Sequence, residues 1–394
     1  MQPIPECVLI LAPMKPHKIP GKRRHLIFIV TWLVFIIISA VQSVPSGRSA
    51  APPPKELSDR QFWTLSKDWS EEDGVFRSDN LLSNETSFQY VIPALLKTAK
   101  QGGVYLGVGP EQNFTYIAAL KPAMAIIIDI RHGNLDVQLM YKALFELSKD
   151  RGDFVSRLFS RKRPNGLTEK STVSEIFTEY VAAEGNKEIY DENLKAIEDV
   201  LMKKHGFPLT SGDLEGIRWA LGNYYQFGPA INYSSSLSAS VPPTIVGATG
   251  GGFGNNGVTY ASLMMSDDGF GQSRSFLASQ ENFEFLKDIE ARNLVIPVVG
   301  DFGGNKAIRA VGSYLKSVDA RVSAFYLSNV EQFLVQDGKW NTFCASTAAL
   351  PLDATSSFIR SGRGRNGFGG GGVQNSSTGN MLQELMACRR PAVR

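Results

Sequence analysis

Residues that could contact a ligand are concentrated in residues 104–134. This segment reads as a strand, a glycine turn, a helix and a second strand that ends abruptly at Asp129. A buried parallel strand is a short, continuous apolar run, which residues 125–128 provide with Ala-Ile-Ile-Ile. The pattern predicts the first half of a nucleotide-binding βαβ unit. In such a unit, glycines let the backbone approach the ligand, and an acid accepts its hydrogen bonds.

The turn at residues 107–111 argues against a dinucleotide as that ligand. Pro110 removes an amide donor, and Glu111 adds a negative charge where a pyrophosphate would lie. Residues 252–257 and 362–367 both match the pattern G-x-G-x-x-G. However, both lie in glycine-rich segments, and neither is followed by a predicted strand that ends in an acidic residue. A nicotinamide-dependent oxidoreductase is therefore the weakest of the enzyme classes considered.

The text LGVGPE followed by IIIDIR resembles the first two motifs of the class I S-adenosylmethionine-dependent methyltransferases. The resemblance implies that the loop of Gly107 and Gly109 faces the methionine part of S-adenosylmethionine and that Asp129 accepts bonds from both ribose hydroxyls. Glu111 stands where that family usually has a third glycine, and Tyr105 where an acid is common. The later segments DFGGNKAIRAVGSYL and AFYLSNVEQFL resemble a group of uncharacterised exported bacterial proteins with such a body, over residues from about Phe62 to Arg360.

Polar residues follow each of the predicted strands. In open α/β sheets, ligands bind beyond the carboxyl ends of the strands, so we expect these residues to meet in one cleft. Each of them has an ordinary alternative as a helix cap or a turn residue, and residues 83–86 in particular read as a cap. The expected cofactor contacts are Gly107, Gly109, Glu111, Asn113, Asp129 and Arg131, and the expected substrate cleft is Asn84, Glu85, Asp301, Asn305, Asn329 and Glu331.

Few side chains are suited to catalysis. Of the four histidines, two precede the apolar N-terminal segment, which leaves His132 and His205. His132 either lines the cleft or faces solvent, and a lone loop histidine more often faces solvent. No G-x-S-x-G or H-E-x-x-H motif occurs, so we expect no metal site and assign no catalytic residue. Methyl transfer needs mainly alignment of the reactants, so this does not exclude a methyltransferase.

The loop at residues 266–275 contains Asp267, Asp268, Arg274 and Ser275. It has two interpretations of equal weight. Such a polar loop either closes over a ligand or simply links two helices.

Composition excludes two classes of protein. With 43% hydrophobic and 20% charged residues in 394, the chain has enough apolar material for a proper core and is not disordered as a whole. The net charge is only +3, and part of it lies in the first 25 residues, so the charge does not indicate nucleic-acid binding. Beyond the N-terminus only Cys344 and Cys388 remain, and we favour two free thiols over a single disulfide.

The N-terminus carries an export signal. Residues 1–25 are basic, and residues 26–44 form an uncharged apolar run. Basic residues before such a run keep that flank in the cytoplasm and direct the downstream chain across the membrane. The run is either a cleaved signal peptide or an anchor in the inner membrane, and we expect the rest of the chain to be periplasmic or otherwise extracytoplasmic.

The remaining organisation is predicted from the pattern of the elements. We expect a three-layer α/β sandwich with a mostly parallel, Rossmann-like sheet of methyltransferase type. The segments are a Pro-rich linker at 45–58, the α/β domain at 59–358 with a helical insertion at 151–233, and a flexible glycine-rich tail with a short helix at 359–394.

Two functions fit these expectations. The first is an exported protein that binds a small molecule or a protein partner in the cleft. The alternative is an active S-adenosylmethionine-dependent methyltransferase. Export favours the first, because S-adenosylmethionine is made in the cytosol.

Overall fold

The computed structural model describes residues 53–76, 78–233, 235, 258–363 and 374–388. All of the described residues belong to one compact unit, residues 50–394. The predicted export segment at 26–44 and the glycine pattern at 252–257 lie outside the described residues. Within the described ranges, no helix is both long and apolar enough to cross a membrane.

A six-stranded sheet forms the centre of the described fold, in the order β3-β2-β1-β4-β5-β6. Five strands are parallel, and β6 runs antiparallel to β5 at the edge. This confirms the predicted α/β fold with a mostly parallel sheet. The strands are β1 (Val104–Gly107), β2 (Met124–Asp129), β3 (Val295–Val299), β4 (Val322–Ser328), β5 (Ser357–Arg363) and β6 (Gln374–Asn380).

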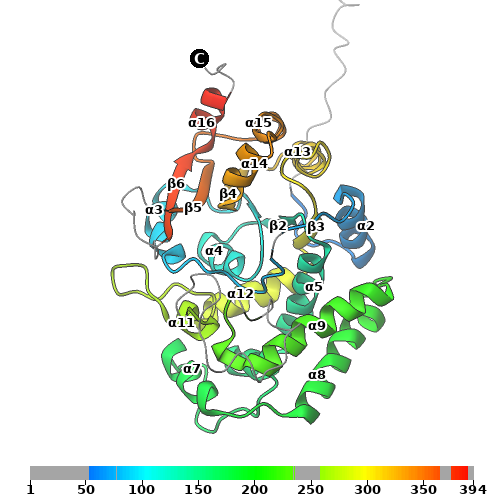
Figure 1. Ribbon diagram of the computed structural model, residues 1–394, viewed down its shortest axis with the longest axis vertical. Helices are drawn as coiled ribbons and strands as arrows, with labels where there is room; N and C mark the ends of the chain where they lie inside the picture. Colours follow the sequence, from blue (N-terminus) through cyan, green and yellow to red (C-terminus); the bar gives the residue numbers. More distant parts are fainter. Residues whose placement is uncertain (1–52, 77, 234, 236–257, 364–373, 389–394) are drawn as a thin grey trace, which may run out of the picture. The chain divides into compact units, whose positions relative to one another are not determined.

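Helices cover both faces of the sheet, which gives three layers (Figure 1). Both faces being covered explains why β1 to β4 are continuous apolar runs. On one face, α4 (Gln112–Leu120), α5 (His132–Leu147) and α12 (Gln280–Ala291) pack on one another. On the other lie α13 (Ala307–Ser317), α14 (Val330–Gln336) and α15 (Trp340–Thr347). Helix α2 (Asp59–Trp69) packs on β3 and α13, and the turn η2 (Phe88–Val91) leads into α3 (Ile92–Thr98) beside α4.

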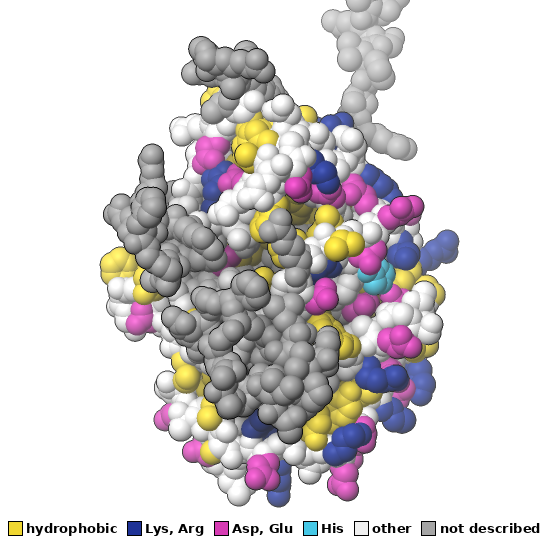
Figure 2. Space-filling view, viewed as in Figure 1, with side chains coloured by type: hydrophobic (Ala, Val, Ile, Leu, Met, Phe, Trp, Pro, Cys, Tyr) yellow, Lys and Arg dark blue, Asp and Glu magenta, His cyan; other side chains and the backbone are white. Residues whose placement is uncertain are grey.

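Residues 151–233 are mostly helical, as their pattern predicts. Capping boxes start two of the helices, with Thr172 paired to Glu175 and Thr210 paired to Asp213. The region packs on the sheet domain through the contact of α9 with α5, and α11 (Tyr260–Met265) packs on α7. Its elements are α6 (Arg151–Phe159), α7 (Val173–Ala182), α8 (Lys187–Glu198), η3 (Asp199–Lys204), α9 (Ser211–Phe227) and η4 (Gly228–Ala230). Basic and acidic side chains are interspersed over the described part of the face in Figure 2.

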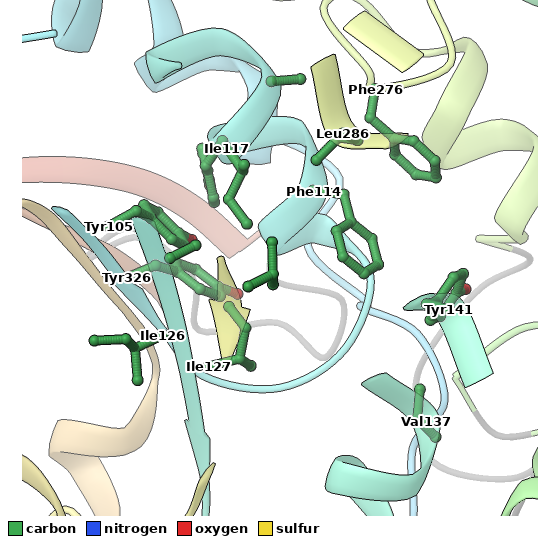
Figure 3. Packing of buried hydrophobic residues seen from close by; sticks show 14 of the residues in the cluster. Tyr105, Phe114, Ile117, Ile126, Ile127, Val137, Tyr141, Phe276, Leu286 and Tyr326 are labelled. Carbon is green, nitrogen blue, oxygen red and sulfur yellow. The ribbon is translucent and has the colours of Figure 1, made fainter. Parts of the chain in front are cut away.

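An aromatic cluster joins α4, α5 and the segment that leads into α12. The ring of Phe114, in α4, lies 5.0 Å from that of Tyr141, 5.2 Å from that of Phe145 and 5.6 Å from that of Phe276 (Figure 3). Three segments far apart in the chain are thereby packed into one core. Aromatic pairs at such separations contribute beyond the area they bury.

The two flanks of the glycine-rich tail differ from the prediction of a flexible segment, and residues 364–373 between them lie outside the described residues. The flanks are β5 and β6, which pair from Ser357 with Asn380 to Arg363 with Gln374. An antiparallel edge pair is held by backbone hydrogen bonds and does not need a continuous apolar run, so its composition did not reveal it. Helix α16 (Met381–Cys388) follows and packs on α15, as expected for the short final helix.

Cys344 and Cys388 are joined by a disulfide, and the expectation of free thiols is wrong. The bond links α15 to α16, with the two Cα atoms 6.0 Å apart. Two cysteines separated by 44 residues carry no sequence signal of pairing. They meet because β5 and β6 return the chain to α15.

Replacing both cysteines with serine is expected to lower the free energy of unfolding by about 4 kcal/mol. The reason is that the bond closes a loop of 44 residues and so restricts the unfolded chain. Urea unfolding of the double variant and of the oxidised wild type measures the difference. Peptide masses that show two free thiols in the unreduced wild type would contradict the pairing.

Candidate functional site

A cleft of about 310 Å³ lies at the carboxyl ends of the parallel strands. The strand order reverses between β1 and β4, and it is at such a switch point that open α/β sheets form a ligand crevice. Residues from both sides of the switch line the cleft. The lining residues that the sequence predicted are Asn84, Glu85, Gly109, Asp129, Arg131, Asp301 and Asn329.

The glycine loop is built as the sequence suggests, but its glycines have different roles. Gly109 lines the cleft with φ of +79°, a conformation that favours glycine. Gly107 does not line the cleft. A Cβ atom on Gly107 would lie 1.9 Å from Asn113 Oδ1, so this glycine makes room for Asn113.

Asn113 supports the loop from behind and does not line the cleft. Its Nδ2 donates to the carbonyls of Val108, Gly109 and Pro110 at 2.7–3.1 Å, and its Oδ1 accepts from Tyr105 at 2.8 Å. The side chain therefore uses its hydrogen-bonding capacity to hold the loop. It is positioned to order the loop rather than to bind a cofactor.

Glu111 is also absent from the cleft lining and is fully buried. Its Oε1 accepts a hydrogen bond from the amide of Ser83 at 3.2 Å. Burial raises the pKa of Glu111 to about 8. The prediction that this carboxylate stands where a pyrophosphate would lie is wrong, because the chain turns into α4 here and directs neighbouring side chains to different sides.

Two more predicted residues lie outside the cleft. Asn305 is exposed, in the loop that precedes α13. Glu331 pairs with Arg360 of β5, with Nε to Oε2 at 2.6 Å and a second contact at 3.0 Å. Both residues follow a strand, but α14 carries Glu331 away from the cleft, and Asn305 lies on the exposed loop between β3 and α13.

Asp129 lines the cleft and forms a two-point ion pair with Arg131. Nε and Nη2 of Arg131 lie 3.0 Å from Oδ1 and Oδ2 of Asp129, and the Arg131 amide donates to Oδ1 at 2.9 Å. Arg131 Nη1 also donates to the carbonyls of Ser78 and Asn80. Both carboxylate oxygens thus have partners within the protein, and the pair holds residues 78–80 against the sheet.

Glu85 is the buried acid of the cleft. The η2 turn that follows it has Ser87 at its N-cap with no side-chain capping bond, so the capping interpretation of Glu85 is wrong. Glu85 Oε1 accepts from Tyr326 at 2.9 Å and from Ser328. Burial raises the pKa of Glu85 to about 7, although hydroxyls of Ser328, Tyr326 and Ser361 lower it in part.

The hydrogen-bond chain continues from Glu85 across the cleft. Gln112 Nε2 donates to Tyr326 Oη at 2.5 Å, and Gln112 Oε1 is buried without a partner among the described residues. Ser328, at the end of β4, has φ of +51° and sits where the β4–β5 register shifts. A non-glycine residue in this region costs free energy and is typical of functional sites.

The opposite wall combines apolar side chains with a second ion pair. Asp301 Oδ2 lies 2.6 Å from Lys339 Nζ, and Asp301 Oδ1 accepts from the Gly303 amide at 2.7 Å. Phe76 meets Phe333 edge to face, with ring centroids 5.2 Å apart. The apolar residues that line the cleft include Val75, Phe76, Phe302, Val330, Phe333 and Leu334.

Sequence reasoning missed Gln112, Tyr326, Ser328 and Lys339. A signal for two of them existed, because Tyr326 and Ser328 are two residues apart at the end of β4 and so share one face of the strand. The prediction considered Asn329 and Glu331, which follow the strand, and did not consider the last residues of the strand itself. Lys339 had no signal, since it lies beyond α14.

The polar loop at residues 266–275 is a closed turn and does not line the cleft. Asp268 accepts from the amides of Phe270 and Gln272 and pairs with Arg274, whose Nε lies 2.6 Å away. These contacts are internal to the loop. The structure therefore supports the linker interpretation.

Comparison with known proteins assigns a family to the chain. No curated protein matches it. A family described as a domain of unknown function, DUF7790, matches residues 81–205 and 259–384, which include the strands β1 to β6 and most of the cleft. The chain therefore belongs to the family described as domain of unknown function DUF7790.

Proposed function

We propose that the protein binds a small molecule in the cleft at the strand carboxyl ends. The observation that carries this proposal is the buried chain from Glu85 through Tyr326 to Gln112 at the switch point of the sheet. Such a group of convergent polar residues in a partly apolar cleft is typical of ligand sites. The positive φ of Ser328, which lines the cleft at the end of β4, also supports the proposal.

The chemistry of the lining indicates the class of ligand. Asp129 and Asp301 are each balanced by a basic partner, and Asp337 shares Lys339 with Asp301, whereas Glu85 forms no ion pair with the described side chains. The site therefore favours a neutral or cationic molecule over an anion. Its hydroxyl or amine donors would reach Glu85, and its apolar or aromatic part would pack on Phe76 and Phe333.

We also place this function outside the cytoplasm. The basic residues before the apolar run at 26–44 support export. The disulfide between Cys344 and Cys388 adds support, because such bonds persist in oxidising compartments and are rare in the cytosol.

A matched pair of asparagine variants tests ligand binding in the cleft. Asn329→Trp places an indole in the cleft, whereas Asn305→Trp places one on an exposed loop near the same sheet edge. In saturation-transfer NMR with a fragment library that includes adenosine, we expect hits on the wild type. These hits should be lost in Asn329→Trp and kept in Asn305→Trp. Hits that survive both substitutions, or no hits at all, would contradict the proposal.

The second candidate is an S-adenosylmethionine-dependent methyltransferase. In its favour, Gly109 and Asp129 face the same cleft, as the motif resemblance implies. Against it, both oxygens of Asp129 already hold Arg131, so the ribose hydroxyls would compete with a buried ion pair.

Calorimetry with S-adenosylmethionine separates the two candidates. If the methyltransferase candidate is right, millimolar S-adenosylmethionine binds the full-length protein, and Asp129→Asn weakens binding by at least about tenfold, the effect of losing a charge-assisted hydrogen bond. Asn305→Ala is the control outside the cleft. No heat and no stabilisation at millimolar concentration would exclude the cofactor and leave the first proposal intact.

A further inference from the structure

Three potential metal ligands meet where α5 packs on α9. His132 is the first residue of α5, Asp136 lies one turn later, and Asp213 is in the first turn of α9. One ligand atom from each lies within 4.8 Å of the other two. His132 Nε2 is 2.6 Å from Asp213 Oδ1 and 3.7 Å from Asp136 Oδ1. None of the three residues lines the cleft described above.

The carboxylate of Asp136 gives a second, independent indication that a ligand binds at this cluster. Its side chain is 4% exposed, and its Oδ1 has no hydrogen-bond partner among the described residues. A buried carboxylate is costly unless it is paired or binds a metal. A Cβ atom on Gly216 would lie 2.0 Å from Asp136 Oδ2, so glycine at this position lets α9 approach the carboxylate closely.

The other two ligands are held in place by outer contacts. Asp213 Oδ2 accepts from the amide and the hydroxyl of Thr210 at 2.6 and 2.8 Å, which leaves Oδ1 for the cluster. The amide of His132 donates to Asp73 Oδ1 at 2.7 Å, and this fixes the start of α5. Outer contacts of this kind orient metal ligands in known sites.

We propose that His132, Asp136 and Asp213 bind one divalent transition-metal ion of the Zn²⁺ or Mn²⁺ class. One imidazole nitrogen and two carboxylate oxygens suit these ions better than Mg²⁺ or Ca²⁺, which prefer oxygen alone. Metal–ligand distances of about 2.0–2.2 Å require the His132–Asp213 contact to open slightly. Three protein ligands leave a position for water, and the His132 side chain is 36% exposed at the surface.

Metal titration of the full-length protein tests this site. The protein is purified in detergent without a histidine tag, stripped with EDTA and titrated calorimetrically with ZnCl2, MnCl2 and MgCl2. We expect one equivalent of Zn²⁺ or Mn²⁺ whose binding depends on His132 and Asp136. His132→Asn and Asp136→Asn should weaken it by more than the roughly 10- to 100-fold that loss of an outer partner costs. Mg²⁺ should bind more weakly than either ion.

The control is Glu215→Gln, which removes an exposed charge from the same turn of α9 without removing a ligand. It should keep the wild-type affinity. An equal loss of metal affinity in Glu215→Gln would mean that the ion is attracted to acidic side chains in general, and this would overturn the proposal. Metal binding that survives both His132→Asn and Asp136→Asn would overturn it as well. If the variants fail to fold, Co²⁺ added to the wild type still gives an answer. The absence of visible cobalt absorption bands from a nitrogen and oxygen site would contradict it.

Discussion

Replacing Glu146 with alanine is expected to destabilise the protein by about 3–5 kcal/mol. Glu146 accepts from Lys142 Nζ at 2.9 Å and from His205 Nε2 at 2.9 Å, and its side chain is 3% exposed. Burial opposes its ionisation, but the hydrogen bond from His205 and the charge of Lys142 lower the pKa of Glu146 to about 2. Its removal would leave Lys142, which is almost fully buried, without this counter-charge.

An exposed ion pair provides the control for that substitution. Glu281 pairs with Lys121 at the surface, with its side chain 77% exposed, so Glu281→Ala should cost no more than about 1 kcal/mol. Urea unfolding followed by circular dichroism compares the two variants. A loss below about 1 kcal/mol for Glu146→Ala would show that Lys142 is satisfied without Glu146. The paired replacement Lys142→Met with Glu146→Leu should recover part of the loss, since Lys142 is then not left buried without its counter-charge.

The second large effect is a fall in stability as the pH rises from about 5 to 8. Burial raises the pKa of Glu85 to about 7 and the pKa values of Glu111 and Glu290 to about 8, from an unfolded value of 4.5. Between these values the folded state binds more protons than the unfolded state, so each pH unit upward removes stability. The pKa shift of Glu85 alone corresponds to a loss of about 3 kcal/mol in the free energy of unfolding as the pH rises from its unfolded to its folded pKa.

Thermal unfolding at pH 5.5 and pH 8 measures this dependence, and we expect the higher midpoint at pH 5.5. Glu146 does not oppose the trend in this range, because a carboxyl with a lowered pKa loses its stabilising effect only as the pH falls below 4.5. Glu290→Gln removes one of the three groups and should flatten the slope. A midpoint that is constant or higher at pH 8 would mean that these carboxyls are ionised in the folded protein.

These two results bear on different parts of the molecule. Glu146, Lys142 and His205 join α5 to η3, and His205 Nδ1 reaches Asp59 of α2, so this cluster holds the helical region to the start of the described chain. Glu85 lines the cleft, and Glu111 is buried outside the cleft lining. A ligand that donates to Glu85 would favour its ionised form and offset part of the stability lost at high pH.

The candidate site was predictable in part. Asp129, Gly109, Asp301 and Asn329 were named from the rule that ligands bind beyond strand ends, and all four line the cleft. The rule could not separate them from Asn305 and Glu331, because the direction of a side chain after a strand depends on how the next helix starts. It also could not show that Arg131 would occupy both oxygens of Asp129, which is a matter of side-chain conformation.

The amino-acid sequence by itself determined the elements of the parallel sheet and their class. Runs such as residues 124–128 are apolar without a break, which is the pattern of a strand that is covered on both faces. Helices with an apolar stripe and a capping residue were equally clear, because the interactions that start them lie within three or four residues.

Tertiary structure alone decided the contacts between residues far apart in the chain. His132 meets Asp213 across 81 residues, Cys344 meets Cys388 across 44, and Tyr326 meets Glu85 across 241. The β5–β6 pair also depends on the sheet edge that it joins. The physical reason is that local sequence specifies φ, ψ and the apolar face of an element, whereas packing of those faces determines which polar side chains are buried together.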